Sequence, residues 1–267
     1  MTHTQCLWTI SDICAATSGQ INNYAKTAKT DAVITGVSID SRETNAGDLF
    51  VALPGTVSDG HQFLADAQSA GANAALVAKI DDGLNLPQIC VADCLQALRK
   101  LGAAGRARFH GIQFGITGSV GKTGSKEMLR HALSQFGSCH ASARSFNNQI
   151  GVPISLANLP QKADFAVQEL GMNAAGEIAK LTRLTRPQVA LITRVADSHS
   201  AFFSSTADIA AAKAEIFQAF EGLSIAILNR DDAFYETLHT AAIAAGAKQV
   251  ISFGHHPEAA FRLASNK

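Results

Sequence analysis

The sequence predicts an α/β protein: a small mixed α/β N-terminal domain followed by a larger domain built on a parallel sheet. From Gly111 onward, apolar strands alternate with helical segments, the order that produces a parallel sheet with right-handed crossovers. Strands such as Val189–Ile192 are apolar throughout, as strands covered on both faces must be. A length of 267 residues is typical of two domains, each with its own core. We therefore expect domains of residues 1–105 and 106–267.

The predicted elements of the first domain are short and of mixed type. Runs of β-branched and apolar residues predict strands, and apolar residues at helical spacing predict helices. Asp93 is a suitable N-cap for a helix that continues to about Arg108. In chain order we expect a helix over 9–16, strands over 33–39 and 49–53, a helix over 61–70, strands over 74–78 and 88–91, and the helix that follows Asp93.

The second domain alternates regularly between the two element types. In an open parallel sheet, ligands bind beyond the carboxyl ends of the strands, so polar residues at those ends are the candidates for a site. We expect strands over 112–116, 165–170, 188–193, 224–228 and 248–253. We expect helices over 122–136, 175–184, 206–220 and 232–245.

The composition excludes several classes of protein. The 22 basic and 22 acidic residues give a net charge of zero, which argues against nucleic-acid binding through a broad basic surface. Apolar runs all fall short of the roughly 18 residues of a membrane span. The N-terminus lacks the basic start and apolar stretch of a signal peptide. The five cysteines are odd in number and lack metal-type spacing, which favours a reduced, cytoplasmic protein.

Gly115–Thr123 is the most informative segment of the sequence. An apolar strand leads into a glycine-rich turn that ends in Gly-Lys-Thr, and a helical stretch follows, the context of a phosphate loop. Backbone N–H groups of such a loop surround a triphosphate, while Lys122 reaches the β- and γ-phosphates and the Thr123 hydroxyl holds Mg²⁺. The alternative is a plain glycine turn between strand and helix. The predicted ATP-binding residues of the loop are Thr117, Gly118, Ser119, Val120, Gly121, Lys122 and Thr123.

Further polar residues stand at or near the strand ends of the second domain. Glu169 closes an apolar strand, where a carboxylate is well placed to hold Mg²⁺. His199 follows the next strand, although a loop histidine taken alone is more often a surface residue. Lys213 lies in a predicted helix, where a lysine is usually solvated. Asn229–Asp232 follows a further strand and is open to interpretation as a simple turn and helix cap.

Taken together, these segments resemble the Mur ligases, the ATP-dependent enzymes that build the peptidoglycan precursor. Ser38–Arg42, with Gly47–Leu53 and Asp59–His61, is similar to the nucleotide-sugar domain of that family. The phosphate loop and the Lys126–Met128 segment that follows it are similar to the ATP-binding part. The resemblance to the branch that adds D-alanyl-D-alanine is carried by Asn147–Pro153, Glu169–Asn173 and Gly176–Ile178; Ala190–Thr193, His199 and Ala212–Phe217 complete the set.

The resemblance implies a role for each matching residue. It implies that Lys213 is carboxylated by CO₂, which requires an amine that is neutral part of the time. It also implies that Glu169 holds a first Mg²⁺ and that His199 holds a second, with Thr123 and Lys213 as further metal contacts. Catalytic residues are then expected to be Lys122, Lys213 and His199; Asn148 is expected at the nucleotide, and Ser41, Arg42 and Asn147 at the UDP-sugar substrate.

The resemblance also implies an activity. ATP phosphorylates the terminal carboxylate of a UDP-N-acetylmuramoyl tripeptide, and the amine of D-Ala-D-Ala attacks the acyl phosphate. ATP and Mg²⁺ are the implied cofactors, and we expect a monomer in the cytoplasm. A third domain of the family has no counterpart in these 267 residues, so we expect the chain alone to be inactive in ligation.

Two alternatives to this function remain open. One is the related ligase that adds the third residue of the peptide, which shares the Asp-Ser-Arg motif. The segments Glu169–Asn173 and Lys126–Glu127 argue against it. The other is a non-catalytic fragment that binds nucleotide without turnover.

Overall fold

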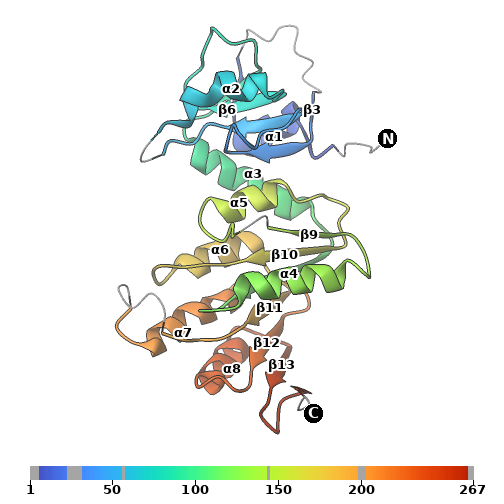
Figure 1. Cartoon of the computed structure of the whole chain (residues 1–267), viewed down its shortest axis with the longest axis vertical. Coiled ribbons are helices and arrows are strands. Elements are labelled where there is room, and N and C mark those ends of the chain that lie inside the picture. Colours follow the sequence, from blue (N-terminus) through green and yellow to red (C-terminus); the bar gives the residue numbers. More distant parts are fainter. Residues whose placement is uncertain (1–5, 23–31, 56–57, 143–144, 198–202, 264–267) are drawn as a thin grey trace. The chain divides into compact units, whose positions relative to one another are not determined.

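The computed structural model describes residues 6–22, 32–55, 58–142, 145–197 and 203–263. The chain divides into two compact units (Figure 1). The first contains residues 1–108 together with 156–161, and the second contains 109–155 and 162–267. The short segment 156–161 is a return of the chain to the first unit that the sequence pattern does not indicate.

The first unit is built on a five-stranded sheet with the strand order β2-β7-β6-β5-β4. The strands are β2 (Gln20–Ile21), β4 (Gly36–Ser38), β5 (Asp48–Val51), β6 (Ala74–Val77) and β7 (Gln88–Cys90). Only the β2–β7 pair is antiparallel in this sheet. A separate antiparallel pair joins β1 (Trp8–Thr9) to β3 (Val33–Ile34).

The helical elements of the first unit are α1 (Ile10–Thr17), the 3₁₀ turn η2 (Gly60–Phe63), α2 (Leu64–Ser69) and α3 (Cys94–Arg108). Thr9 and Asp12 form a capping box at the start of α1. Asp93 Oδ1 accepts hydrogen bonds from the N–H groups of Leu95 and Gln96, which confirms it as the cap of α3.

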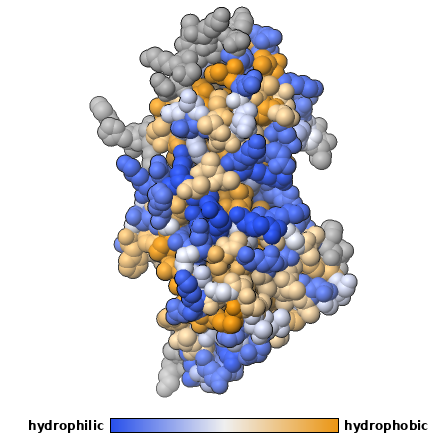
Figure 2. Space-filling model, turned by 180° about the vertical axis from the view of Figure 1, so that it is seen from behind, coloured by the Kyte–Doolittle hydropathy of each residue, from blue (hydrophilic) through white to orange (hydrophobic). Residues whose placement is uncertain are grey.

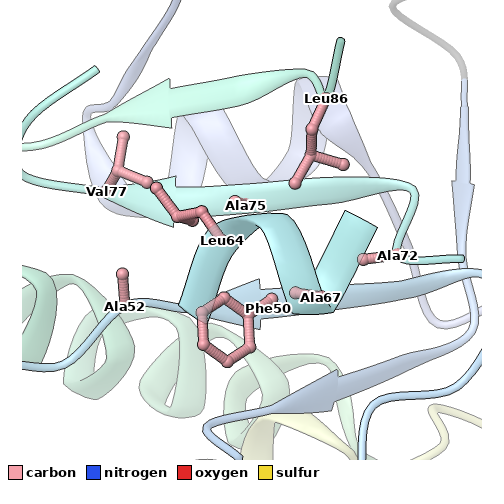
Figure 3. Packing of buried hydrophobic residues seen from close by; sticks show 8 residues of the cluster. All are labelled: Phe50, Ala52, Leu64, Ala67, Ala72, Ala75, Val77 and Leu86. Carbon is pink, nitrogen blue, oxygen red and sulfur yellow. The ribbon is translucent and has the colours of Figure 1, made fainter. Parts of the chain in front are cut away.

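The core of the first unit lies between α2 and the strands β5 and β6. Figure 3 shows Phe50 and Ala75 on these strands facing Leu64 and Ala67 of the helix. Burial of such side chains stabilises a fold by about 1.5–3 kcal/mol for each large one. The cluster contains Phe50, Ala52, Leu64, Ala67, Ala72, Ala75, Val77 and Leu86.

The returning segment 156–161 is held in the first unit by specific polar contacts. The indole Nε1 of Trp8 donates to the carbonyl of Ala157 at 2.7 Å. The side chain of Asn158 pairs with both backbone groups of Val37, accepting at 2.8 Å and donating at 2.9 Å. Trp8 is itself held in place by Arg108, whose guanidinium lies 3.4 Å from the centre of the Trp8 ring in a cation–π contact.

The second unit contains a seven-stranded sheet with the order β14-β13-β12-β11-β8-β10-β9, and every pairing in it is parallel. This confirms the predicted α/β class. The strands are β8 (Ile112–Thr117), β9 (Cys139–Ala141), β10 (Phe165–Glu169), β11 (Val189–Ile192), β12 (Ile225–Asn229), β13 (Gln249–Gly254) and β14 (Phe261–Arg262).

Helices cover both faces of this sheet. Thr123 of α4 reaches Glu169 of β10, whereas Ile216 of η3 lies beside Gly115 of β8. Gly115 pairs in register with Gln168, and neighbouring residues of a strand point to opposite faces. The helical elements are α4 (Lys122–Leu133), α5 (Gly151–Ala157), α6 (Glu177–Thr185), α7 (Thr206–Ala214), the 3₁₀ turn η3 (Glu215–Phe217) and α8 (Tyr235–Ala244).

The second unit differs from the sequence prediction at a few elements. The helix expected over 206–220 is an α-helix that tightens into the 3₁₀ turn η3 at Glu215. Helix α5, which carries Pro153 in its first turn, and the edge strands β9 and β14 were not predicted. Pro153 is compatible with a helix at this point because N–H groups of the first turn have no intrahelical partner.

Hydrophobic and hydrophilic side chains are interspersed on the face presented in Figure 2. Among the described residues, large apolar side chains that stay exposed include Met128 on α4 and Phe136 shortly after it. Scattered exposure of this kind is normal for a folded domain.

Candidate functional site

The candidate site lies beyond the carboxyl end of β8, at the point where the chain changes sides in the sheet. Strand β8 is flanked by β10 on one side and β11 on the other. The chain leaves β8 through α4 toward β9 and β10, and then crosses to β11. Ligands of open parallel sheets bind at such switch points.

The loop between β8 and α4 is held in place by the segment that follows β11. Ser119 N donates to the carbonyl of Arg194 at 2.7 Å, and the hydroxyl of Thr193 donates to the carbonyl of Val120 at 2.7 Å. The backbone of Gly118 and Gly121 has φ of 153° and 83°, a region that favours glycine. A Cβ atom on Gly118 would lie 1.9 Å from Thr193 Oγ1, so only glycine fits this cradle.

Lys122 is the first residue of α4, next to the loop it would serve. Its ammonium donates to the carbonyl of Gly118 at 2.7 Å and lies 3.4 Å from that of Ser119. Burial lowers the pKa of this ammonium, and the nearby Glu169 carboxylate opposes that shift. The Lys122 side chain thus folds back over the loop. Its ammonium lies at the N-terminus of α4, where the helix dipole favours bound anions.

Glu169, the last residue of β10, links the glycine-rich loop before α4 to the segment before α5. Its carboxylate is buried, with 1% of the residue exposed. Oε2 accepts a hydrogen bond from the Thr123 hydroxyl at 2.9 Å, and Oε1 accepts one from Asn147 Nδ2 at 2.8 Å. A carboxylate and a hydroxyl in contact at the edge of a phosphate loop are ligands that Mg²⁺ accepts.

Lys213 is buried in the last turn of α7, with 2% of the residue exposed. Burial, and second the positive charge of Lys122, lower the pKa of its ammonium to about 8. An amine with this pKa is neutral for a substantial fraction of the time near pH 8, as a reaction with CO₂ requires.

Other predicted site residues have different surroundings. Asn148 Oδ1 accepts from the N–H groups of Ile150 and Gly151, so this side chain caps α5. Ser41 and Arg42 lie in a turn of the first unit, after β4. The Arg42 side chain is 87% exposed and pairs with Asp40 through two hydrogen bonds of 2.9 and 2.6 Å. His199 lies outside the described residues.

Two further residues, Glu215 and Asp232, were not among the predicted site residues but join separate elements of the second unit. Glu215 of η3 accepts from the N–H groups of Gly176 and Ala179, and so caps α6, which has no side-chain cap of its own. Asp232 does cap the turn before α8 through Phe234 N, but its other oxygen accepts from Val195 N at 2.6 Å. Glu215 lies in the segment Ala212–Phe217 and Asp232 in Asn229–Asp232, two segments that the sequence pattern already singles out. The hydrogen-bond partners of these two carboxylates are visible only in the folded chain.

The donor set suits a magnesium–nucleotide complex better than a metal held by the protein alone. Among the described residues, no group of three or more His, Cys, Asp or Glu side chains could hold a metal ion. Mg²⁺ is usually bound by one or two protein oxygens together with phosphate oxygens and water. Glu169 and Thr123 fit that pattern.

Two parts of the sequence match domain models of known proteins. Residues 33–104 match the family described as "Mur ligase family, catalytic domain", and residues 116–267 match "Mur ligase middle domain". In the described part of the chain, no helix is both long and apolar enough to cross a membrane.

Curated relatives carry the name UDP-N-acetylmuramoyl-tripeptide–D-alanyl-D-alanine ligase. The protein from Escherichia coli is 42% identical over 202 residues, which is 76% of this chain and 44% of that protein. The protein from Synechocystis sp. is 41% identical over 205 residues, or 76% of this chain and 45% of that protein. The chain thus spans about half the length of the relatives it matches.

Solved structures agree with these relatives. MurF from Acinetobacter baumannii has a TM-score of 0.78 and 33% identity, covering 93% of this chain and 53% of that one. MurF ligase from Thermotoga maritima, solved in complex with ADP, has a TM-score of 0.69 and 28% identity, covering 83% and 50%. Since the middle-domain match alone takes in more than half of the residues, this chain belongs to the Mur ligase family.

Proposed function

We propose that the chain supplies the nucleotide-sugar-binding and ATP-binding parts of a ligase that adds D-Ala-D-Ala to a UDP-N-acetylmuramoyl tripeptide. The observation that carries the ATP-binding part is the buried Glu169 carboxylate, hydrogen-bonded to the Thr123 hydroxyl at the edge of a glycine-rich loop. The names of the relatives support the substrate assignment. We further propose that the reaction takes place in the cytoplasm and that the protein is a monomer.

The proposed roles combine the contacts of the described side chains with the resemblance to the Mur ligases. Lys122 offsets the charge of the β- and γ-phosphates, and Thr123 and Glu169 contact Mg²⁺, which would draw electron density from the phosphates. Ser41 and Arg42 contact the UDP part of the sugar substrate, while Asn147 and Asn148 border the nucleotide and the substrate. His199 and Lys213 are proposed for a second Mg²⁺, the lysine as its carbamate.

The proposed reaction has two steps that balance. A carboxylate oxygen of the tripeptide attacks the γ-phosphorus of ATP, and ADP leaves with the electrons of the broken P–O bond. The amine of D-Ala-D-Ala then attacks the carbonyl carbon of the acyl phosphate, loses a proton, and expels phosphate. What the described residues contribute is charge neutralisation and orientation of the phosphates.

Calorimetry with a non-hydrolysable ATP analogue and Mg²⁺ tests the nucleotide site. Lys122→Ala removes a hydrogen bond to a charged group, worth about 1.5–3 kcal/mol, so we expect a loss of roughly 10- to 100-fold in affinity. Lys162→Ala, at an exposed lysine of the same unit, is the matched control and should bind like the wild type. Equal affinity in Lys122→Ala and the wild type would reject the phosphate loop.

Binding of two natural precursors tests the substrate assignment against its rival. A ligase that adds D-Ala-D-Ala should bind the UDP-muramoyl tripeptide more tightly than the dipeptide, because the tripeptide is its substrate. The ligase that adds the third residue should show the reverse preference. Tighter binding of the UDP-muramoyl dipeptide would therefore assign the chain to the ligases that add the third residue.

A further inference from the structure

A fully buried lysine lies in the helix that follows the phosphate loop, and none of the proposed chemistry uses it. Lys126 of α4 has 0% of its surface exposed. Its ammonium donates to the carbonyl of Ser142 at 2.8 Å and lies 3.1 Å from Glu127 Oε1. The second oxygen of Glu127 accepts from Arg130 Nε at 2.9 Å. Lysine is rarely buried without such partners, because a desolvated charge is costly.

The carbonyl that Lys126 holds belongs to the chain segment that reaches Glu169. Ser142 follows β9, and its N–H donates to the carbonyl of Val167 at 3.2 Å. Five residues later, Asn147 donates its side-chain N–H to Glu169 Oε1 at 2.8 Å. The carbonyl of Asn147 accepts from Gly171 N at 2.7 Å, so this residue is tied to the chain on the far side of Glu169 as well.

Helix α4 therefore contacts the surroundings of Glu169 at two places. Thr123 donates to Glu169 Oε2, and Lys126, three residues along the helix and on the same side of it, holds the Ser142 carbonyl. The Glu169 carboxylate is thus bonded on one oxygen by α4 and on the other by Asn147. Lys126 ties α4 to the segment that carries Asn147.

A methionine would fill the volume of Lys126 without the cost of burying a charge. What the ammonium adds is directional polar contacts, among them the bond to the Ser142 carbonyl. We infer that Lys126 is a positioning residue: through Ser142 it keeps Asn147 in place, and through Asn147 it orients the Glu169 carboxylate toward Mg²⁺. This inference rests on the proposed function, because it concerns the proposed magnesium ligand. Groups that orient a metal ligand typically change metal affinity by 10- to 100-fold.

The test measures the Mg²⁺ concentration at which binding of an ATP analogue is half-maximal, by calorimetry. We expect Lys126→Met to raise this midpoint about 10-fold, while affinity for the analogue without Mg²⁺ stays unchanged. Lys180→Met, at an exposed lysine of α6, is the matched control and should leave the midpoint unchanged. Thermal unfolding of each variant shows that the comparison is made on folded protein.

Repeating the measurement in the Asn147→Ala variant distinguishes a positioning role of Lys126 from a general effect on stability. If Lys126 acts through Asn147, then Lys126→Met should shift the Mg²⁺ midpoint much less in Asn147→Ala than in the wild type. If Lys126→Met does not fold, Lys126→Gln replaces it, because its amide N–H can donate to the Ser142 carbonyl without a charge. Its side chain is shorter and uncharged, so the bond is weaker, and we expect a smaller rise of the midpoint, of about 3-fold, that disappears in Asn147→Ala. A midpoint equal to that of the wild type in Lys126→Gln would then overturn the positioning role.

Failure of the positioning role and failure of the proposed function give different results. An unchanged midpoint in Lys126→Met, or equal shifts in the two backgrounds, would overturn the positioning role even if the melting temperature falls. A wild-type chain without any Mg²⁺-dependent binding of the analogue would instead reject the proposed function itself.

Discussion

Thr123, in the first turn of α4, donates its hydroxyl hydrogen to Oε2 of Glu169, at the end of β10, over 2.9 Å. The two residues are 46 positions apart in the sequence. The helix that follows the glycine-rich loop and a strand-end carboxylate are therefore joined directly. The same hydroxyl and the same carboxylate are the proposed contacts of Mg²⁺, so the contact brings together in advance two of the ligands that the metal needs.

Glu169→Gln should separate metal binding from nucleotide binding. The amide oxygen can still accept the hydrogen bond from Thr123. The amide NH2 replaces the oxygen that accepts from Asn147, so the Asn147 side-chain amide must turn over and accept instead. With that adjustment the local fold should persist, but the negative charge is lost. We expect the Mg²⁺ midpoint for binding of an ATP analogue to rise by about 10-fold or more. Affinity without Mg²⁺ should not fall, because a negative charge near the phosphates has been removed. Glu236→Gln, at an exposed residue of α8, is the control, and calorimetry with and without Mg²⁺ is the measurement.

Arg42→Ala should weaken the binding of UDP and leave the ATP analogue unaffected. The Arg42 guanidinium is exposed and aligned by Asp40, ready for a bidentate contact with a diphosphate. We expect a loss of about 10-fold in UDP affinity. NMR titration of the whole chain with UDP should shift Ser41 and its neighbours in the wild type. Lys100→Ala, at an exposed lysine of α3, should behave like the wild type; a similar loss there would show that UDP binds through general charge.

His140 should make the stability of the second unit depend on pH. Burial lowers the pKa of this imidazole, while its hydrogen bond to the Ser155 carbonyl at 2.9 Å opposes the shift. The unfolded chain therefore binds more protons than the folded one below the ordinary histidine pKa of about 6.5. Stability is fully present above that value and is lost as the pH falls through the lower, folded pKa.

Thermal unfolding at pH 7.5 and pH 5.5 checks this expectation. The melting temperature of the wild type should fall between the two, and it should fall less in His140→Gln, whose amide N–H can still donate to Ser155. His110→Gln, at an exposed histidine, should keep the wild-type pH dependence. An unaltered pH dependence in His140→Gln would show that His140 does not contribute.

Lys213 should form a carbamate that ¹³C NMR detects with labelled bicarbonate. Its pKa of about 8 makes the neutral amine available, and that amine adds to the carbon of CO₂ and releases a proton. We expect a carbamate signal at about pH 8 that weakens toward pH 6.5, as the amine becomes protonated. Lys213→Met should lack the signal, whereas Lys162→Met should retain it. A signal that persists in Lys213→Met would belong to another amine.

Much of the second unit was predictable because its strands are unusually apolar. Val189–Ile192 is buried at three of its four positions, and Ile225–Asn229 alternates between buried and partly exposed residues. Such apolar runs differ clearly from the helical segments between them. Strand β9, with only Cys139–Ala141 and no fully buried residue, gives no comparable signal. Helix α5 is short and contains Pro153, so its pattern resembles that of a strand or loop.

The parts of the candidate site that belong to a local sequence motif were predictable. The parts that depend on tertiary packing were not. The glycine-rich loop and the strand-end Glu169 have local patterns that indicate a function. Whether Lys213 is buried, however, depends on what packs around α7, and a sequence shows only a helix lysine. The bonds of Glu215 to α6 and of Lys126 to Ser142 join segments that are far apart in the chain or in different elements, so the sequence pattern does not indicate them.

Two glycines of the loop region should respond in opposite ways to replacement by alanine. At Gly118, φ is 153° and a Cβ atom would lie 1.9 Å from Thr193 Oγ1. That hydroxyl holds the carbonyl of Val120 at 2.7 Å, so an alanine must push Thr193 away and release the tip of the loop. Gly118→Ala should therefore weaken binding of an ATP analogue by at least about 10-fold, since correct orientation of the N–H groups is lost.

At Gly124, inside α4, a Cβ atom would have no neighbour within 4 Å. Gly124→Ala should keep the wild-type affinity and gain up to about 1 kcal/mol of stability, because alanine favours the helix. Calorimetry and thermal unfolding of the two variants measure both effects. Adding Thr193→Ala to Gly118→Ala removes the clash but not the backbone strain, so it should restore affinity only in part. Wild-type affinity in Gly118→Ala would show that this loop does not hold the phosphates.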